Sequence, residues 1–286
     1  MMTNPDRREG SNFIPLVINF AQREMAARYK RSLLGWLWSL LNPASTVLIY
    51  SLVFGVFLRT EPPETANGQA EIFAVYLFTG LVVWNLFNGV INGSMDWLTG
   101  VMDLRKKAYF PTETAILGGA IAAIVQTCFE IAVLFVLMLA LGNVSWTFLL
   151  LPFILLGAAS FGLGIGLVVA ILNARYRDVR YLIGIVLSLQ FFLVPIVYPI
   201  GLLADPEVDE FGVPLTEPID TYGLPAQEIV RWNPVSEFVQ AAHDVVYFLE
   251  VPSLGRVAIM LVAATVSPAL GLRYFRKRSM EISEEL

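Results

Sequence analysis

Long apolar stretches with few or no charged residues alternate with short polar segments along most of this chain. A helix of about 20 apolar residues is long enough to cross the hydrocarbon core of a membrane. Six stretches reach this length, and the predicted spans are residues 33–58, 72–95, 114–141, 146–172, 181–203 and 251–274. The pattern therefore predicts an all-α integral membrane protein in which residues 1–286 form a single transmembrane domain.

Two further segments are amphipathic rather than uniformly apolar. Residues 12–32 are apolar at the start and basic at the end, which is typical of a helix lying at the cytoplasmic membrane interface. Residues 234–250 show helical spacing, with an apolar face and a polar face that carries Glu237, Gln240 and His243. They predict an amphipathic or re-entrant helix on the outer side, before the last span. Together with the proline-rich, acidic segment in front of them, they form an outer loop and helix over residues 204–250.

Composition and charge placement support a membrane protein and set its orientation. Hydrophobic residues make up 56% of the chain and charged residues only 15%, against about 25% charged residues in soluble domains. Basic residues gather in every other polar segment, which is the positive-inside pattern of a multi-pass protein. This predicts a protein of the cytoplasmic (inner) membrane with both termini in the cytoplasm. The polar first residues show no apolar region of a signal peptide.

Motifs for catalysis, metal binding and nucleotide binding do not occur in the sequence. A G-x-x-x-x-G-K-[ST] phosphate loop is missing, so the chain does not bind ATP through that motif. His243 is the sole histidine, which excludes a histidine-cluster metal site, and we expect it to be a solvated side chain on the outer helix. Cys128 is the only cysteine and lies in an apolar span, where we expect a buried, inert thiol.

The third predicted span contains the acidic residue Glu130, one turn after Gln126. A carboxyl group inside a membrane span indicates a functional site, such as a polar path or a proton relay. The alternative is a hydrogen-bonded group that fixes helix packing, and the absence of a basic partner in any span favours it. In the fourth span, Ala158, Gly162 and Gly166 recur every four residues and predict close helix packing.

Two of the predicted spans each present an aromatic and hydroxyl-bearing face. The first span carries Tyr50, Phe54 and Phe57, with Ser39 and Thr46 close to the same stripe. The fifth span carries a second face, made of Gly184, Ser188, Phe191, Pro195 and Tyr198. Such faces can stack on sugar rings and hydrogen-bond to them. Ordinary lipid contact or helix packing is the alternative, and spacing alone favours it.

Five short motifs occur in a fixed order along these elements. They are segments 28–43 (RYKRSLLGWLWSLLNP), 104–111 (LRKKAYFP), 175–179 (RYRDV), 195–198 (PIVY) and 232–234 (WNP). With six spans and an N-terminal interfacial helix, they resemble the permease subunits of the ABC exporters for O-antigen, teichoic acid and related polysaccharides. The resemblance covers residues 13–277, nearly the whole chain.

This resemblance implies a transport subunit that is not itself an enzyme. Two copies of the chain would pair, and two separate ATP-binding cassette subunits would bind below them and hold ATP and Mg, so that this chain needs no cofactor. The loop between the second and third spans, residues 96–112, would be the coupling helix that contacts the ATPase. The implied contact residues are Asp103, Arg105, Lys106 and Lys107.

The resemblance also implies a cargo and a path for it. The cargo class is a polyprenyl-diphosphate-linked glycan, and the basic cluster Arg28, Lys30 and Arg31 is placed to attract its diphosphate. The first and fifth spans would line a channel between the two copies. The implied channel-lining residues are Ser39, Thr46, Tyr50, Phe54, Phe57, Ser188, Phe191 and Tyr198.

Other functions stay open at the level of sequence. An ABC exporter of drugs or small lipids shares the same architecture, and the aromatic faces favour a sugar cargo over it. A membrane-bound glycan-modifying enzyme requires a catalytic histidine or an acidic pair at the membrane face, and the sequence shows neither. A proton-coupled transporter has only Glu130 in its favour. Nothing in the sequence indicates a nucleic-acid partner.

Overall fold

The structure is a computed structural model that describes residues 6–28, 30, 32–59, 63, 65, 72–105, 107, 110–198, 230 and 232–285. Every regular element within these ranges is helical, as predicted. The longer elements are α1 (Asp6–Arg28), α2 (Trp38–Tyr50), α3 (Phe73–Thr99), α5 (Glu113–Ala140), α6 (Leu151–Arg175), α7 (Val179–Leu193), α9 (Pro234–His243) and α10 (Leu254–Glu285). The shorter ones are η1 (Gly35–Leu37), the π-helical η2 (Ser51–Phe57), α4 (Met102–Arg105), η3 (Trp146–Leu150) and the π-helical η5 (Asp244–Phe248).

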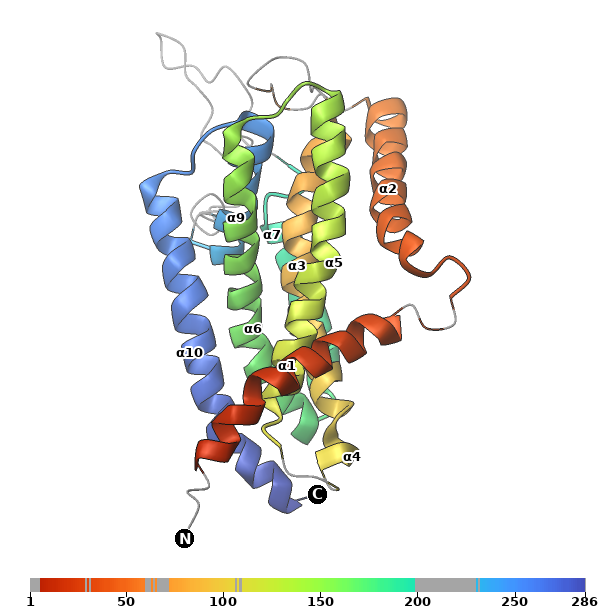
Figure 1. The fold of residues 1–286 in the computed structure, drawn as a ribbon. Helices are drawn as coiled ribbons and strands as arrows, with labels where there is room; N and C mark the ends of the chain where they lie inside the picture. The colour runs from red at the N-terminus through yellow and green to blue at the C-terminus, as the bar shows by residue number, and fades with distance from the viewer. Residues whose placement is uncertain are drawn as a thin grey trace.

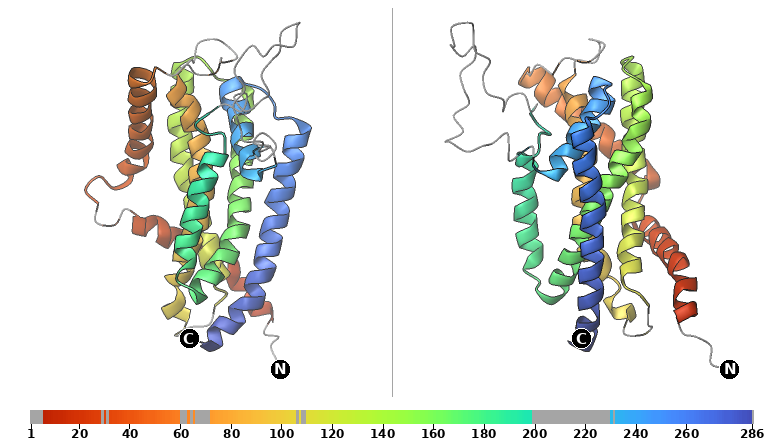
Figure 2. Two further views of the ribbon diagram at one scale, coloured as in Figure 1. Left: turned by 180° about the vertical axis from the view of Figure 1, so that it is seen from behind. Right: turned by 90° about the vertical axis from the view of Figure 1, so that its left-hand side faces the viewer.

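The long helices form an upright bundle around α3 (Figures 1 and 2). α3 packs against α5, α6 and α9, and most of its residues are buried. α2 and α10 lie on opposite sides of this core and expose most of their apolar surface. Both described ends of the chain lie at one end of the bundle, which we call the basal end; the other is the distal end.

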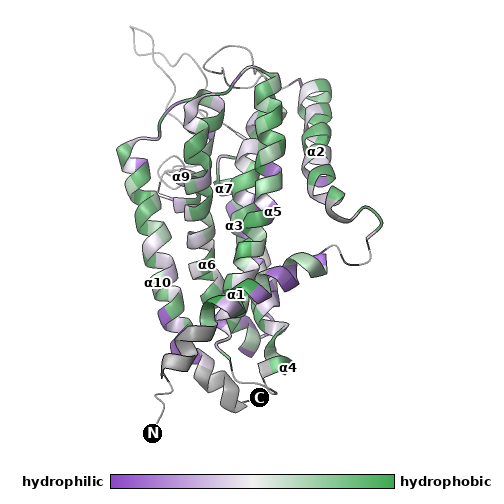
Figure 3. Ribbon diagram, viewed as in Figure 1, coloured by the Kyte–Doolittle hydropathy of each residue, from purple (hydrophilic) through white to green (hydrophobic). Residues whose placement is uncertain are grey.

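Five segments of the described chain are long and apolar enough to cross a membrane. They are Trp38–Phe57, Phe73–Leu104, Glu113–Ala140, Trp146–Arg175 and Leu254–Ser279. These segments confirm five of the six predicted spans, including the last one, whose charge-free core is short. Figure 3 shows that the shafts of these helices are hydrophobic, whereas hydrophilic residues gather on the second half of α1 and near the basal end.

The predicted fifth span is not confirmed as a membrane-crossing helix. α7 has 15 residues, which is a length of about 22 Å against a hydrocarbon core of about 30 Å. It ends because Val194 has an extended backbone (φ −96°, ψ 132°), the conformation that a following proline, here Pro195, imposes on its neighbour. The rest of the predicted span, residues 199–203, and the predicted acidic loop up to residue 229 lie outside the described residues.

Small residues bring α6 into close contact with two neighbouring helices. A Cβ atom on Gly166 would lie 2.3 Å from Ser94 Oγ of α3, and one on Gly164 would lie 2.4 Å from the Ser267 carbonyl oxygen of α10. Because these distances are below any real Cβ contact, only glycine allows the two helix axes to approach this closely. The prediction of close packing along this face of the fourth span is therefore confirmed.

The predicted N-terminal helix begins earlier and ends earlier than residues 12–32, at Asp6 and Arg28. It crosses the bundle obliquely near the basal end (Figure 1) and meets α5 at Gly118, where a Cβ atom would lie 2.6 Å from Phe20 Cβ. Phe20 also packs on Phe110 at a ring-centroid distance of 5.6 Å. α1 is thereby anchored to the segment that joins α3 to α5. Its place at the membrane interface stays a prediction.

One prediction about the apolar spans is wrong. Cys128 lies on an exposed side of α5 instead of being buried, because α5 buries only one of its faces against α1 and α3. Hydropathy identifies a span but does not say which of its faces meets lipid and which meets protein.

The two ends of the bundle provide a direct test of the predicted orientation. In a Cys128→Ser background, Lys107→Cys at the basal end should react with an impermeant thiol reagent only after the cells are opened. Val144→Cys, exposed in the distal turn after α5, should react in intact cells. Labelling of position 107 from outside would reverse the orientation derived from the positive charges.

Candidate functional site

Two polar cavities meet inside the membrane-crossing part of the bundle, between α1, α2, α3 and α5. Their volumes are about 410 and 450 Å³, within the range of small-molecule sites. The first is lined from the basal end upwards by residues of α1, α3 and α5, and the second extends from it beneath α2. The residues lining both cavities are Arg28, Asn85, Gln126 and Glu130.

Glu130 is the acidic group at the junction of the two cavities. Its carboxyl group interacts with the side chain of Asn85 and with the charge of Arg28. Its Oε2 atom is buried and has no hydrogen-bond partner within the described part of the chain. Gln126, one turn earlier, accepts a hydrogen bond from the Ser39 hydroxyl (3.3 Å), which links α5 to α2. The predicted pair Gln126 and Glu130 therefore faces a polar cavity.

The structure adds one participant that the sequence analysis missed. Asn85 lies near the middle of α3 and lines both cavities. Its position inside a membrane span was the available signal, because a polar amide there must find a partner or line a cavity. The helical pattern alone did not connect it to Glu130, which lies on a different helix.

The predicted basic cluster lies partly at these cavities. Arg28 lines both of them, whereas Lys30 is exposed and Arg31 lies outside the described residues. The first cavity also contains Arg23 and Glu24 of α1. Charges of both signs therefore surround the basal opening, with arginine present at each of the cavities.

The aromatic stripe of the first span lies on α2 and η2, beside α3. The Phe54 ring packs against Phe73 of α3 at a centroid distance of 4.7 Å, and Tyr50 lies 6.0 Å from Phe54. Phe57 is exposed. The Ser39 side chain is buried, and Thr46 donates a hydrogen bond to the Asn42 carbonyl oxygen (3.0 Å). Within one protomer, Phe54 therefore contacts α3, and Tyr50 packs on Phe54.

The predicted face of the fifth span lies on α7 and the turn that follows it. Ser188 is exposed and donates a hydrogen bond to the Gly184 carbonyl oxygen, and Phe191 packs on Trp84 of α3 at 5.6 Å. The Tyr198 hydroxyl donates to the Phe192 carbonyl oxygen (3.1 Å). Phe54 and Phe191 therefore each have a ring contact with α3. Along α7, only Leu187 is buried.

The predicted coupling segment, residues 96–112, lies at the basal end. It consists of the end of α3, the short helix α4 and the connection that leads to α5, with Asp103 and Lys107 exposed. Arg105 is the last residue of α4, and Lys106 lies outside the described residues. Asp96 forms an ion pair with Arg180 at the start of α7. The segment is therefore linked to α7 by charge and to α1 by aromatic packing.

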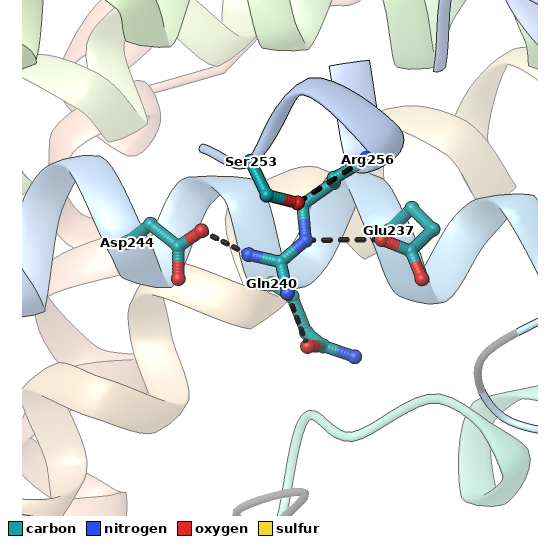
Figure 4. A network of polar contacts seen from close by, with 5 residues as sticks. All are labelled: Glu237, Gln240, Asp244, Ser253 and Arg256. Carbon is teal, nitrogen blue, oxygen red and sulfur yellow. Dashed lines mark hydrogen bonds and ion pairs between the residues drawn. The ribbon is translucent and has the colours of Figure 1, made fainter. Parts of the chain in front are cut away.

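A second polar cluster lies near the distal end, where α10 begins beside α9 (Figure 4). Arg256 donates to Glu237 Oε2 (2.9 Å), to Gln240 Oε1 (2.8 Å) and to Asp244 Oδ2. The Glu237 side chain is 7% exposed, and those of Arg256 and Asp244 are each 19% exposed. Acids of α9 and η5 therefore surround the Arg256 side chain.

The prediction of a solvated His243 is also wrong. Its side chain is 1% exposed, its Nε2 lies 3.0 Å from the Tyr76 carbonyl oxygen, and its ring stacks on Tyr76 at 3.9 Å. Burial lowers the pKa of His243 to about 4. The polar face of this helix is therefore buried against α3 and α10, and the histidine is neutral at physiological pH.

These features define a class of protein before any comparison is made. A bundle of apolar spans that encloses a polar cavity near its centre is typical of transport proteins, because buried polar groups in a membrane mark substrate pathways. Among the described residues, no group of three or more His, Cys, Asp or Glu side chains is placed to hold a metal ion.

Comparison with protein families makes the class specific. Residues 16–208 match the family described as "ABC-2 type transporter", and the chain belongs to this family. The O-antigen export system permease protein RfbA of Myxococcus xanthus is 30% identical over 199 residues, which cover 69% of this chain and 74% of that protein.

Two further relatives match almost end to end. The O-antigen export system permease protein RfbA of Klebsiella pneumoniae is 24% identical over 274 residues, or 95% of both chains. The polysialic acid transport protein KpsM of Escherichia coli is 23% identical over 267 residues, or 90% of both chains. These relatives are named for O-antigen export and for polysialic acid transport, in agreement with the resemblance seen in the sequence motifs.

Proposed function

We propose that this chain is the transmembrane subunit of an ABC exporter that moves a polyprenyl-diphosphate-linked polysaccharide out across the cytoplasmic membrane. The observation that carries the proposal is membership of the ABC-2 type transporter family with relatives named for O-antigen and polysialic acid export. The fold supports it through a polar cavity that opens towards the basal end and contains Arg28, a cation suited to a diphosphate group.

The energy source in this proposal is a separate pair of ATPase subunits. The sequence has no phosphate loop, so ATP must be hydrolysed by a partner. Asp103 and Lys107 are exposed on the short segment around α4 at the basal end. We propose that Asp103, Arg105, Lys106 and Lys107 form the surface that contacts the ATPase.

The glycan path in this proposal lies between two copies of the chain. α2 and α7 both flank α3 and leave broad apolar faces uncovered in the single protomer. Pairing two such protomers would cover these faces and place the α2 stripe of one copy opposite α7 of the other. Aromatic rings along such a path offer broad faces to sugar C–H groups and allow a long polymer to slide.

This path predicts the outcome of a double substitution. Tyr50→Ala with Phe54→Ala should lower glycan export by roughly fivefold, because two ring faces are lost, while complex assembly and basal ATP hydrolysis persist. The matched control is Phe135→Ala with Phe153→Ala, which removes two exposed aromatics from α5 and α6. Export at the wild-type rate, or failure only through misfolding, would assign Tyr50 and Phe54 to packing within the protomer.

The function itself is tested by depletion. Cells that lose this protein should accumulate a lipid-linked glycan in the inner leaflet, which can be extracted and identified by mass spectrometry. An ABC exporter of drugs or small lipids would instead leave the glycan pools unchanged and alter drug sensitivity or lipid composition. Unchanged glycan pools after full depletion would contradict the proposal.

A further inference from the structure

We infer that the two joined cavities around Glu130 bind the sugar phosphate group at the lipid-linked end of the cargo. Glu130 and Asn85 would form hydrogen bonds with the sugar hydroxyls, and Arg28 would bind the phosphate. This inference rests on the proposed function and adds the residues that select the first sugar. It is carried by the cavities and their lining, which lie mainly on α1, α2, α3 and α5. Thr46 of the α2 stripe lines the second cavity, whereas the face of α7 lines neither.

The cavities are joined through their common lining of Arg28, Asn85, Gln126 and Glu130. The first cavity, which we also call the lower one, begins near Asp96 and Gly100 at the basal end of α3 and reaches Asn85, near the middle of that helix. The second cavity, beneath α2, is the upper one. A headgroup that enters from the basal side therefore meets Glu130 at the inner end of the cavity, well within the membrane-crossing part of the bundle.

The donor and acceptor set at this inner end suits a group rich in hydroxyls. Glu130 Oε2 is buried and has no hydrogen-bond partner within the described ranges, and leaving such an atom unpaired is costly. A carboxylate accepts hydrogen bonds only, whereas an amide such as Asn85 both donates and accepts. A sugar hydroxyl satisfies both groups, because it donates to the carboxylate and accepts from the amide.

Two tryptophan rings line the same space. Trp38 lines the upper cavity and is 42% exposed, and Trp97 lines the lower cavity and is 9% exposed. The ring of Trp97 is held between α3 and α5 by Gly93 and Gly119, where added Cβ atoms would lie 2.5 and 2.0 Å from it. The exposed Trp38 ring lines the cavity that also contains Glu130 and Asn85, so it offers a sugar stacking beside directional hydrogen bonds. Trp97 lies twelve residues, about 18 Å, from Asn85 along α3, nearer the basal end.

The charges of the cavity are distributed to match a phosphate followed by a neutral sugar. Arg28 lies at the junction and can bind phosphate oxygens through two N–H groups. Towards the basal end the first cavity also contains Arg23, Glu24 and Asp96, and Asp96 is paired with Arg180. A ligand whose phosphate reaches Arg28 therefore places its next residue against Glu130 and Asn85.

The test compares two soluble probes that carry the same charge. Farnesyl glucosyl diphosphate and farnesyl methyl diphosphate differ only in the sugar, and their dissociation constants are measured by titration calorimetry on the full-length permease in phosphatidylcholine nanodiscs. The wild type should bind the glucosyl probe about tenfold more tightly, since a hydrogen bond to a charged group is worth that factor.

Substitutions then assign the preference to residues. Glu130→Gln and, separately, Asn85→Ala should reduce the ratio of the two dissociation constants to below about twofold. Arg28→Ala should weaken the binding of both probes by a similar factor and leave the ratio of their dissociation constants unchanged. The matched control is Glu113→Gln on the same helix, outside both cavities, which should keep both constants.

Three results would overturn the inference: equal binding of the two probes by the wild type, no measurable binding of either, or an unchanged ratio in folded Glu130→Gln and Asn85→Ala. The last result is what a role in helix packing predicts. Each of these results leaves the export function intact if depletion still causes lipid-linked glycan to accumulate. Failure of that depletion experiment, with the probe preference retained, would instead overturn the proposed function alone.

Discussion

Replacing Arg256 with alanine is expected to destabilise the folded protein by about 3 kcal/mol, because breaking a mostly buried ion-pair network leaves its acids uncompensated. Glu237 and Asp244 would then lack the guanidinium that contacts both of them. The measurement is the temperature at which the detergent-solubilised protein loses its native elution volume. Since this side chain joins α9 and η5 to α10, the distal end of the bundle should loosen first.

The pH dependence of this variant follows from Asp244. Burial raises the pKa of Asp244, and Arg256 opposes that effect, so the alanine variant should raise this pKa further. A raised folded-state pKa stabilises the fold below the unfolded value of about 3.9, and that stabilisation is lost as the pH rises through the folded value. The loss of stability in Arg256→Ala relative to the wild type should therefore be smaller at pH 5 than at pH 8.

Two control variants separate charge from geometry. Arg256→Lys keeps the charge but loses the planar guanidinium that reaches three partners. The stability of this variant should therefore lie between those of the wild type and the alanine variant. Combining Arg256→Met with Glu237→Gln and Asp244→Asn removes all three charges and should recover most of the stability. If the alanine variant melts like the wild type at pH 8, the cluster in Figure 4 does not stabilise the protein.

Charge and hydropathy were sufficient to predict much of this fold. The five confirmed spans follow from lengths that match the hydrocarbon thickness. The packing role of Gly162 and Gly166 also followed from sequence, because small residues at four-residue spacing have few other uses in an apolar helix. These features depend on local composition, which a single sequence displays directly.

Features that depend on contacts between distant segments were not predictable in the same way. An amphipathic pattern shows that His243 and Glu237 share a face, but it does not say whether that face meets water or a buried arginine. Likewise, Glu130 appeared to be a lone acid, because Asn85 and Arg28 come from other helices. The end of α7 was missed because the apolar run continues past Pro195, whereas the helix does not.

The ATPase-contacting surface gives the largest expected effect on transport. Reversing Arg105 and Lys106 to glutamate should abolish ATPase copurification and lower export by more than about tenfold, because opposing charges across a contact become like charges. The segment is well placed to pass on movement from a partner. Phe20 of α1 packs on Phe110, and Asp96 at the end of α3 pairs with Arg180 of α7.

A matched variant keeps this test specific to the segment around α4. Arg273→Glu with Lys277→Glu makes the same change in net charge on exposed positions of α10, also towards the basal end, and should copurify with the ATPase like the wild type. Copurification and ATP hydrolysis are measured on the intact complex, and export is measured as surface glycan. If the Arg105 and Lys106 reversal behaves like the α10 reversal, the contact lies elsewhere. Loss of binding in the first variant alone would instead assign the transmission of ATP-driven movement to the segment that joins α3 to α5.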